Sequence, residues 1–408
     1  MEDMERQIEN MEISERRMTI NCGKGLPPLI AKTIFSKLVI SDLPSCRLVS
    51  NTWNDLVLDY ASSTQLQFLK NAFLLSTSDR GLNYKLCNPK MHCINLDTRQ
   101  LSNDFDFDLE SEFIKSASLQ FDGDWTYTII MAGSCNGLML ISKCSDYTWC
   151  QGIFNPMTNE FLQVSEHGTF DDFYLYGFGF SPITKQYKLF RVFDKGFRCR
   201  RTSSTVDTHY TMEVLTFGRS GTNHSIPIHN QWRRLHTLPF EIVADGVYLN
   251  GIIYWLVKEK GKDKEKKYVI YALDVETEHI EMTVVLQVPS NGYGKIHQFN
   301  GTIYATFHIN WEKDSRTIQV WRMQEKDSWV RKFVICDISR EWIHLQLIKM
   351  FEDEEILFMI NMDFFCFYNP SSKKKRIISK NQKKKRYICQ IESLNFGRLS
   401  QILEGTQI

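Results

Sequence analysis

The sequence predicts a mainly β protein preceded by a small α-helical module, and three observations support this. The chain of 408 residues is rich in aromatic residues, with 27 Phe, 16 Tyr and 9 Trp, which favour strands. Apolar residues recur every four positions near the start, but after residue 70 they alternate in short runs. Asn-Gly turns that lead into apolar strands recur along the body. We therefore expect a charged flexible tail (1–22), a helical module (23–66), a β body (67–390) and a C-terminal segment (391–408).

Charge and cysteine usage exclude several classes of function. Lys plus Arg number 49 and Asp plus Glu 48, so no general attraction to nucleic acid or anionic membranes is expected. The eleven cysteines include no CxxC pair, which argues against a disulfide framework or a structural zinc site. The longest apolar run, 356–368, is shorter than the roughly 20 residues that span a bilayer. The expectation is a soluble protein of the cytoplasm, the nucleus or both, with no membrane or direct nucleic-acid partner.

Three short helices are predicted in the front module. Leu26, Ile30, Ile34 and Leu38 fall on one stripe of a first helix, and two prolines suit its first turn. Asp42 is placed to cap a second helix, and Ser50 or Asn51 a third. We expect the small core to centre on Trp53. The residues expected to face inward from the second helix are Leu43, Cys46 and Val49.

Repeats in the body predict a β-propeller of kelch-like type. Similar segments containing Asn-Gly begin near residues 134, 248 and 298, and each is followed by a companion strand pair. Equivalent positions lie 46 to 62 residues apart, which fits four short strands per unit. The pattern indicates about six blades, with seven possible, and a twisted sandwich is the alternative. The equivalent positions are Asp97, Asn155, Phe217, Asp274, Met323 and Asn369.

The front module resembles the F-box. The resemblance rests on Leu26-Pro27, the apolar stripe that follows, and the segment "CRLVSNTW". It implies docking on the Skp-type adaptor of a cullin-RING (SCF) ubiquitin ligase, and through that adaptor on a cullin. The residues that it implies for adaptor binding are Leu26, Pro27, Ile30, Ile34, Leu38, Leu43, Cys46, Arg47, Val49 and Trp53.

The body resembles the plant F-box-associated domain. The resemblance rests on "SCNGL" at 134–138, "NPMT" at 155–158, the run from Tyr176 to Val192, Trp232-Arg233, and "LNGIIYWL" at 249–256. Together with the front module it implies a substrate-receptor subunit that brings a protein target to ubiquitination. Such a receptor acts by positioning and needs no catalytic residue of its own.

No catalytic set, metal site or cofactor motif is predicted. Asp104, Asp106 and Asp108 have calcium-loop spacing but lack the loop's Gly and final Glu, so a half-buried strand is favoured. His224 and His229 have no metal-site context. "GFGF" at 177–180 lacks the third Gly of a dinucleotide loop, and a tight turn is favoured.

Candidate target-binding residues lie in loops of the body, where aromatic side chains make efficient anchors. They are Tyr174, Tyr176, Tyr293 and Trp311. Basic clusters at 373–386 indicate a nuclear import signal, a patch for an acidic partner, or a solvated hairpin and its following strand. Two alternative functions remain: a non-degradative F-box scaffold, and a propeller binding protein or enzyme whose helical segment is incidental.

Overall fold

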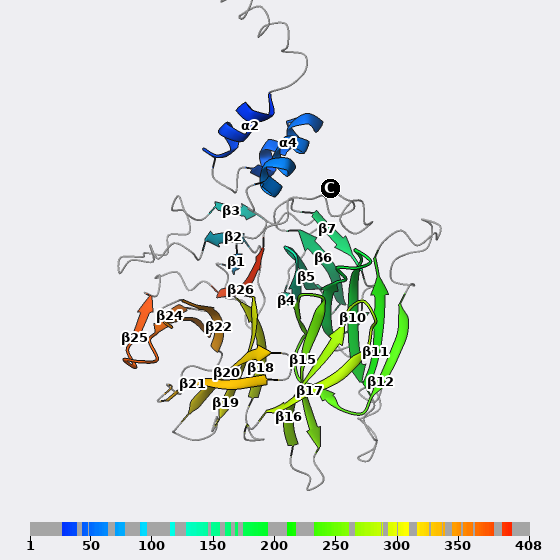
Figure 1. Ribbon diagram of the computed structural model, residues 1–408, viewed down its shortest axis with the longest axis vertical. Helices are drawn as coiled ribbons and strands as arrows, with labels where there is room; N and C mark the ends of the chain where they lie inside the picture. The colour runs from blue at the N-terminus through cyan, green and yellow to red at the C-terminus, as the bar shows by residue number, and fades with distance from the viewer. Residues whose placement is uncertain are drawn as a thin grey trace, which may run out of the picture. The chain divides into compact units, whose positions relative to one another are not determined.

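The computed structural model divides the chain into two compact units, residues 1–69 and 70–408. Unit 1 is helical and unit 2 consists of strands (Figure 1). No helix in the described part of the chain is long and apolar enough to cross a membrane. The structure describes residues 27–38, 43–47, 49–63, 70–77, 90–95, 115–118, 128–145, 148–155, 160–164, 168–169, 174–194, 210–217, 232–260, 266–286, 288, 293–299, 301–309, 316–325, 328–336, 338, 345–351, 354–361, 364–378 and 386–393.

The three predicted helices of unit 1 are confirmed as α2 (Pro28–Phe35), α3 (Leu43–Arg47) and α4 (Asn51–Ser63). Pro27 precedes α2, and its carbonyl accepts a 3.0 Å hydrogen bond from the N–H of Ala31. Ser50 begins α4, because its Oγ accepts a 3.2 Å bond from the N–H of Trp53. Of the two N-caps that the sequence offered for the third helix, Ser50 therefore makes the capping bond.

The strands of unit 2 form six sheets, which we number as blades in the order below. Blade 1 contains β26 (Arg386–Ser393), β1 (Lys70–Thr77), β2 (Lys90–Asn95) and β3 (Lys115–Ser118). Blade 2 contains β4 (Thr128–Cys135), β5 (Leu138–Ser145), β6 (Thr148–Asn155), β7 (Glu160–Gln163) and β8 (Gly168–Thr169). Blade 3 contains β9 (Tyr174–Phe180), β10 (Tyr187–Asp194), β11 (Tyr210–Thr216) and β12 (Arg233–Leu238).

The second half of unit 2 continues the same pattern. Blade 4 contains β13 (Glu241–Ile242), β14 (Val247–Leu249), β15 (Ile252–Lys260), β16 (Lys266–Asp274) and β17 (Ile280–Leu286). Blade 5 contains β18 (Tyr293–Phe299), β19 (Thr302–Ile309), β20 (Thr317–Glu325) and β21 (Ser328–Ile335). Blade 6 contains β22 (Leu345–Met350), β23 (Ile356–Ile360), β24 (Phe364–Tyr368) and β25 (Lys375–Ile378).

The six blades close into a ring through their innermost strands, β26, β4, β9, β14, β18 and β22. Each of these strands contacts the next around the ring, and β22 contacts β26 to complete it. Blade 1 joins the two ends of unit 2, because the C-terminal strand β26 pairs antiparallel with β1 (Figure 1). This arrangement is a β-propeller, as the repeats predicted, and the described residues form six blades.

The repeat positions chosen from the sequence mark equivalent places in five blades. Asn155 ends β6 and Asp274 ends β16, while Phe217 and Asn369 directly follow β11 and β24. Met323 lies two residues before the end of β20. Each of these strands is the third from the axis in its blade. The sixth position, Asp97, lies outside the described residues.

Two Asn-Gly turns adopt the geometry that tight hairpins need. Asn136 and Gly137 have φ of 50° and 80°, and Asn250 and Gly251 have φ of 50° and 86°. Positive φ at both central residues is the mark of a type I′ turn, which matches the twist of the flanking strands. These turns connect β4 to β5 and β14 to β15, so they fix the inner hairpins of blades 2 and 4.

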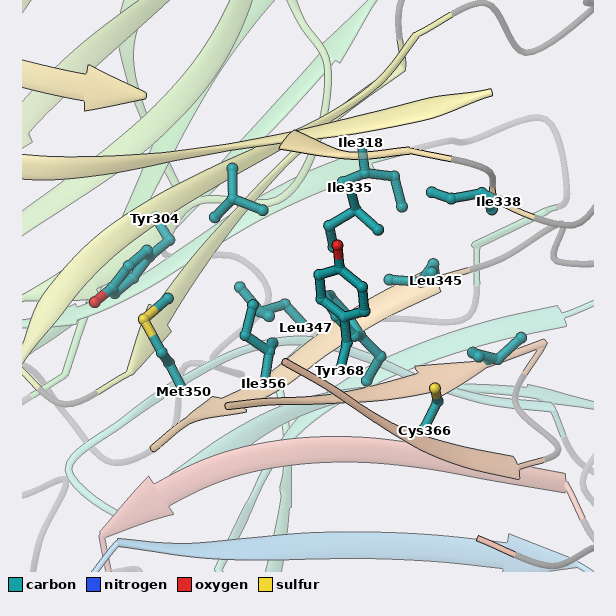
Figure 2. Packing of buried hydrophobic residues seen from close by; sticks show 13 residues of the cluster. Tyr304, Ile318, Ile335, Ile338, Leu345, Leu347, Met350, Ile356, Cys366 and Tyr368 are labelled. Atoms are coloured by element: carbon teal, nitrogen blue, oxygen red, sulfur yellow. The ribbon is translucent and has the colours of Figure 1, made fainter. Parts of the chain in front are cut away.

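The core of the propeller lies between blades and not within one blade. One cluster of buried side chains fills the space between blades 5 and 6, where Tyr304 and Ile318 lie with Leu347 and Tyr368 (Figure 2). Comparable clusters join blades 2 and 3, blades 3 and 4, and blades 4 and 5. A single blade therefore has no core of its own, and each depends on its neighbours.

The "GFGF" segment is an inner strand, not the tight turn that the sequence suggested. Gly177 and Gly179 lie in β9, and a Cβ at Gly177 would stand 2.5 Å from the Trp255 ring of blade 4. The glycines are present because a large aromatic side chain packs directly on the β9 backbone. This close approach is a tertiary contact, which the local pattern does not encode.

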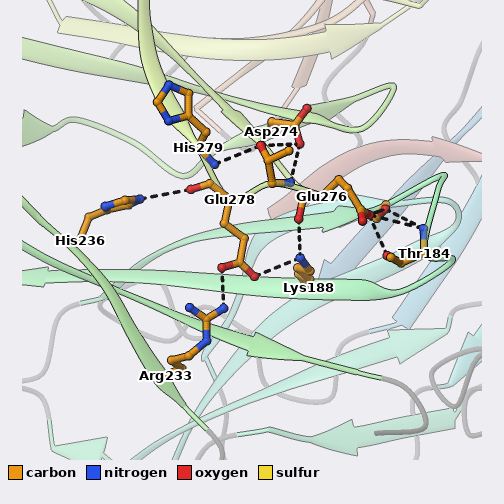
Figure 3. A network of polar contacts seen from close by, with 10 residues as sticks. Thr184, Lys188, Arg233, His236, Asp274, Glu276, Glu278 and His279 are labelled. Atoms are coloured by element: carbon orange, nitrogen blue, oxygen red, sulfur yellow. Dashed lines mark hydrogen bonds and ion pairs between the residues drawn. The ribbon is translucent and has the colours of Figure 1, made fainter.

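A polar clamp also joins blade 3 to the β16–β17 turn of blade 4 (Figure 3). Lys188 Nζ lies 3.0 Å from Glu278 Oε1 and donates to the carbonyl of Glu276 at 3.0 Å. Arg233 bonds the other Glu278 oxygen, and Thr184 Oγ1 donates to Glu276 at 2.8 Å. Burial opposes ionisation of Glu278, but the bonds from Arg233 and Lys188 outweigh it and lower its pKa.

Candidate functional site

The helical unit has a small aromatic core. Phe35 is buried, and its ring centroid lies 5.7 Å from that of Trp53 and 5.6 Å from that of Tyr60. Trp53 itself is only half-buried. The prediction that the core centres on Trp53 is therefore wrong, because Phe35 on α2 is the side chain that both other rings contact. The remaining buried side chains of the described core are Ala31, Leu43 and Val57.

Apolar side chains of the same unit lie exposed on α2 and after α3. Leu29 is 78% exposed, Ile30 46%, Ile34 37% and Val49 63%. The exposed face of α2 therefore carries large apolar groups while Ala31 and Phe35 turn inward. Val49 was expected to face inward and is instead exposed. We call Leu29, Ile30, Ile34 and Val49 the apolar face of the helical unit.

The other residues predicted for adaptor binding have varied surroundings. Leu43 is 1% exposed and belongs to the core, so it supports the surface and does not form it. Arg47 is also buried, and its Nε donates a 2.8 Å hydrogen bond to Asn54 Oδ1, which ties α3 to α4. Pro27 is exposed, and Leu38 and Cys46 are half-buried. Leu26 lies outside the described residues.

Sequence reasoning missed Leu29 because it looked for a strict spacing of four residues. Leu29 directly precedes Ile30 and falls outside the stripe formed by Leu26, Ile30, Ile34 and Leu38. The spacing of Ala31 and Phe35, the two buried residues of α2, is the pattern that would have identified Leu29 as exposed. Ala31 and Phe35 are four residues apart and define the inward face, which leaves Leu29 on the opposite side.

The aromatic candidates of the propeller divide into packing residues and an accessible one. Tyr176 is buried, and Tyr174 is half-buried against Phe193, with ring centroids 5.4 Å apart. Tyr293 is 50% exposed. Tyr174 and Tyr176 lie on β9 and Tyr293 on β18, so all three belong to innermost strands. Trp311 lies outside the described residues.

Near Tyr293, the innermost strands bring together two oppositely charged side chains that the sequence did not single out. Asp245 lies between β13 and β14, and its Oδ1 accepts a 2.7 Å hydrogen bond from the N–H of Tyr176. Lys295 lies on β18, two residues after Tyr293. We call Asp245, Tyr293 and Lys295 the axial cluster. Residues 245 and 295 are 50 positions apart in sequence, so the packing of blade 5 against blade 4 makes them neighbours.

Burial is the largest cause of the pKa shift at each of the three residues of the axial cluster. Burial raises the pKa of Asp245 to about 7, although the Tyr176 N–H and Lys295 both oppose this. Burial also lowers the pKa of Lys295, which Asp245 partly counteracts. The pKa of Tyr293 is raised by burial and then by the charge of Asp245. Asp245 and Lys295 nonetheless keep part of their surface exposed.

Two histidines of blade 5 lie near the cluster, His297 on β18 and His308 opposite Tyr293 on β19. His297 Nε2 lies 2.9 Å from Thr306 Oγ1, and burial, together with Lys295 and His308, lowers the pKa of His297 to about 3. The ring is therefore neutral at ordinary pH. Among the described residues no group of three or more His, Cys, Asp or Glu is arranged to hold a metal ion. Asp104, Asp106, Asp108, His224 and His229 all lie outside the described residues.

Comparison with known proteins establishes the class to which the chain belongs. Residues 24–62 match the F-box domain, and residues 88–397 match the F-box associated beta propeller domain. The second match alone covers more than half of the chain. The protein therefore belongs to the F-box proteins that carry an F-box-associated β-propeller.

Individual relatives come from a plant. The chain is 23% identical to F-box protein At3g07870 of Arabidopsis thaliana over 363 residues, covering 81% of this chain and 78% of that protein. It is 25% identical over 186 residues to F-box protein At1g47340 of the same species, covering 45% of this chain and 34% of that protein. A crystal structure of an oligogalacturonate lyase from Vibrio parahaemolyticus gives a TM-score of 0.39 at 8% identity, covering 76% of this chain and 80% of that chain.

Proposed function

We propose that this protein is the substrate-receptor subunit of an SCF ubiquitin ligase. The apolar face of the helical unit docks on a Skp-type adaptor and thereby on a cullin, and the propeller holds a protein target. The chain contributes no catalytic step, because raising the effective concentration of a target lysine near the ubiquitin thioester suffices. It acts in the cytoplasm, the nucleus or both.

The observation that carries the proposal is the exposure of four large apolar side chains on so small a unit. Burying apolar surface contributes about 25 cal/mol per Å², so these side chains favour association with a complementary surface. The unit's core consists of a few rings and aliphatic groups, and a small module gains stability when it completes its apolar burial on a partner. Two buried residues hold the helices that carry this surface. Arg47 joins α3 to α4 through its hydrogen bond to Asn54, and Leu43 fills the core.

The test is co-purification of the full-length chain from plant cells, with an Ile30→Ser/Ile34→Ser variant beside it. Both side chains are exposed, so the variant should fold normally and lose capture of the adaptor and the cullin together. Ile183→Ser is the matched control, because Ile183 is 77% exposed but lies in the propeller. Equal capture by all three proteins would exclude the apolar face as the docking surface.

A second measurement separates a receptor from a non-degradative scaffold. A receptor's target should accumulate in the captured complex when the proteasome is inhibited, and this accumulation should vanish in the Ile30→Ser/Ile34→Ser variant. A bound protein whose amount is unchanged by proteasome inhibition and by the Ile30→Ser/Ile34→Ser variant would indicate the scaffold function instead.

A further inference from the structure

We propose that the axial cluster of Asp245, Tyr293 and Lys295 binds a carboxamide, the side chain of an Asn or Gln residue in the recruited target. This inference rests on the proposed receptor function and names the chemistry of its target site. It depends on the position of the cluster, on polar groups that are uncommitted, and on its balance of charge.

The cluster lies where innermost strands of four blades converge. The N–H of Gly246 donates to the carbonyl of Tyr176 at 2.7 Å, so the segment carrying Asp245 runs along β9 of blade 3. On its other side, β14 contacts β18, which carries Tyr293 and Lys295. A Cβ at Gly133, on β4 of blade 2, would stand 3.8 Å from the carbonyl oxygen of Gly246. The cluster therefore borders the central axis of the propeller.

The cluster is reached from the end of the axis at which β18 begins. Tyr293 is the first residue of β18 and is half exposed. Lys295 lies two residues further along, about 7 Å deeper, and His297 about 7 Å beyond that. His297 is already hydrogen-bonded to Thr306 and is neutral, so it closes the inner end of the site without adding a charge. A ligand entering at Tyr293 meets both charges before this inner end.

Within the described part of the chain, one carboxylate oxygen of Asp245 and the ammonium of Lys295 have no hydrogen-bond partner. Among the described residues, the N–H of Tyr176 is the single donor that reaches the Asp245 carboxylate, which leaves Oδ2 available. In that part of the chain Lys295 Nζ makes no hydrogen bond or ion pair, and it lies 5.9 Å from the centroid of the Tyr293 ring. Groups that are largely desolvated without a partner are costly, so a ligand that supplies partners gains affinity.

The charges of the cluster select a neutral ligand with both a donor and an acceptor. At pH 8, where Asp245 is ionised and at which binding is measured, a cation that approached Asp245 would be repelled by Lys295, and an anion at Lys295 would be repelled by Asp245. A carboxamide donates its N–H to the Asp245 carboxylate and accepts from the Lys295 ammonium through its carbonyl. The Tyr293 hydroxyl at the mouth adds a donor and acceptor for the same group.

The experiment selects phage-displayed peptides on the full-length protein and then measures one synthetic peptide and its variants. We expect a consensus with one invariant Asn or Gln. Replacing that residue by Met, Glu or Lys should weaken binding at least about tenfold, since each change removes a hydrogen bond to a charged group or adds a repelled charge.

Two protein variants test the site itself. Asp245→Asn keeps the acceptor for Tyr176 but presents a donor to the ligand, and Lys295→Met removes the ammonium. Each should weaken binding at least about tenfold. Glu325→Gln and Lys267→Met, at exposed positions of blades 5 and 4, are controls that should bind as the unaltered protein does.

The opposing results are distinct. A Lys or Arg consensus that responds to Asp245→Asn and not to Lys295→Met would overturn the carboxamide assignment. No consensus, or peptides that bind every variant equally, would overturn the axial site. Adaptor capture measured on the same preparations shows whether the receptor function survives such a result, because the helical unit and the axial cluster share no residue.

Discussion

The helical unit and the propeller use apolar side chains in opposite ways. In the helical unit, Leu29, Ile30, Ile34 and Val49 remain exposed around a core of a few buried residues. In the propeller, buried clusters run from blade to blade, and Trp255, Phe190 and Phe307 have no exposed surface. The comparison teaches that the described propeller buries its large apolar side chains between its own blades, whereas the helical unit leaves several on its surface, as the proposed docking on an adaptor requires.

Charges also differ between the two regions. In the helical unit, the described ion pair Lys32–Asp59 lies at the surface, with side-chain exposures of 36% and 60%. In the propeller, Lys188 and Glu278 are only 8% and 13% exposed and join two blades. The Lys188–Glu278 contact between two blades is therefore shielded from water, whereas the Lys32–Asp59 contact is solvated.

The largest expected effect is on the core of the propeller. Trp255→Ala should lower the free energy of unfolding by about 3–5 kcal/mol, because the ring fills the gap above Gly177 and Gly246. Trp53→Ala, at a half-buried ring of the helical unit, should cost only about 1–2 kcal/mol. Urea unfolding, with fluorescence for the propeller and hydrogen exchange for the helices, measures both. Equal losses would contradict the difference between the two regions.

A smaller effect is expected at the axis, and it depends on pH. Because the pKa of Asp245 is raised from 3.8 to about 7, the folded state holds a proton between these values that the unfolded state lacks. The stability from that proton is present at low pH and is lost as pH rises to 7. Asp245→Asn should therefore be more stable than the unaltered protein at pH 8, by a gain on the order of 1–3 kcal/mol.

His297 produces the opposite dependence and serves as the internal reference. Its pKa is lowered from 6.5 to about 3, so the unfolded state binds more protons between these values, and stability falls as pH falls below 6.5. In the unaltered protein the two slopes oppose each other between pH 4 and 6.5. In Asp245→Asn only the histidine contribution to the pH dependence remains. Unfolding curves at pH 5 and 8 measure this change in the free energy of unfolding. Parallel pH profiles for the two proteins would refute the buried titration of Asp245.

The smallest effects concern the ion pairs. Lys188→Met should lower the free energy of unfolding by about 1–2 kcal/mol, because it removes bonds to the Glu276 carbonyl and to Glu278 in a largely buried clamp. Lys32→Met should change it by less than about 0.5 kcal/mol, because the Lys32–Asp59 pair is solvated. Thermal unfolding at low and high salt compares them, and a larger effect at Lys32 would reverse the expected order.

The sequence predicted the fold class well because its signals are local. Proline at the start of α2, the Ser50 cap and the Asn-Gly turns act through neighbouring residues, and each forms as expected. The repeat positions mark the ends of third strands because each blade repeats the same local pattern. Resemblance to the F-box and to its associated propeller was confirmed on the same residues.

The sites were predicted less well because they depend on which face each residue presents. Val49 was expected to be buried and is exposed, and Phe35 takes the central place in the helical core that was expected for Trp53, since helix packing and not periodicity alone decides which apolar residues are buried. Gly177 was assigned to a turn because its partner, Trp255, lies 78 residues away. No sequence pattern predicted the site at Asp245 and Lys295, because the residues next to each in the chain do not show that an opposite charge lies on a neighbouring blade.

By itself, the sequence determined the order of helices and strands, the four-strand repeat and the family of this protein, because these depend on residues close together in the chain. Only the tertiary structure decided which apolar side chains of α2 stay exposed and which charges meet at the axis. The physical reason is ring closure and helix packing: both place residues from distant segments against each other, and burial then sets their accessibility and their pKa values.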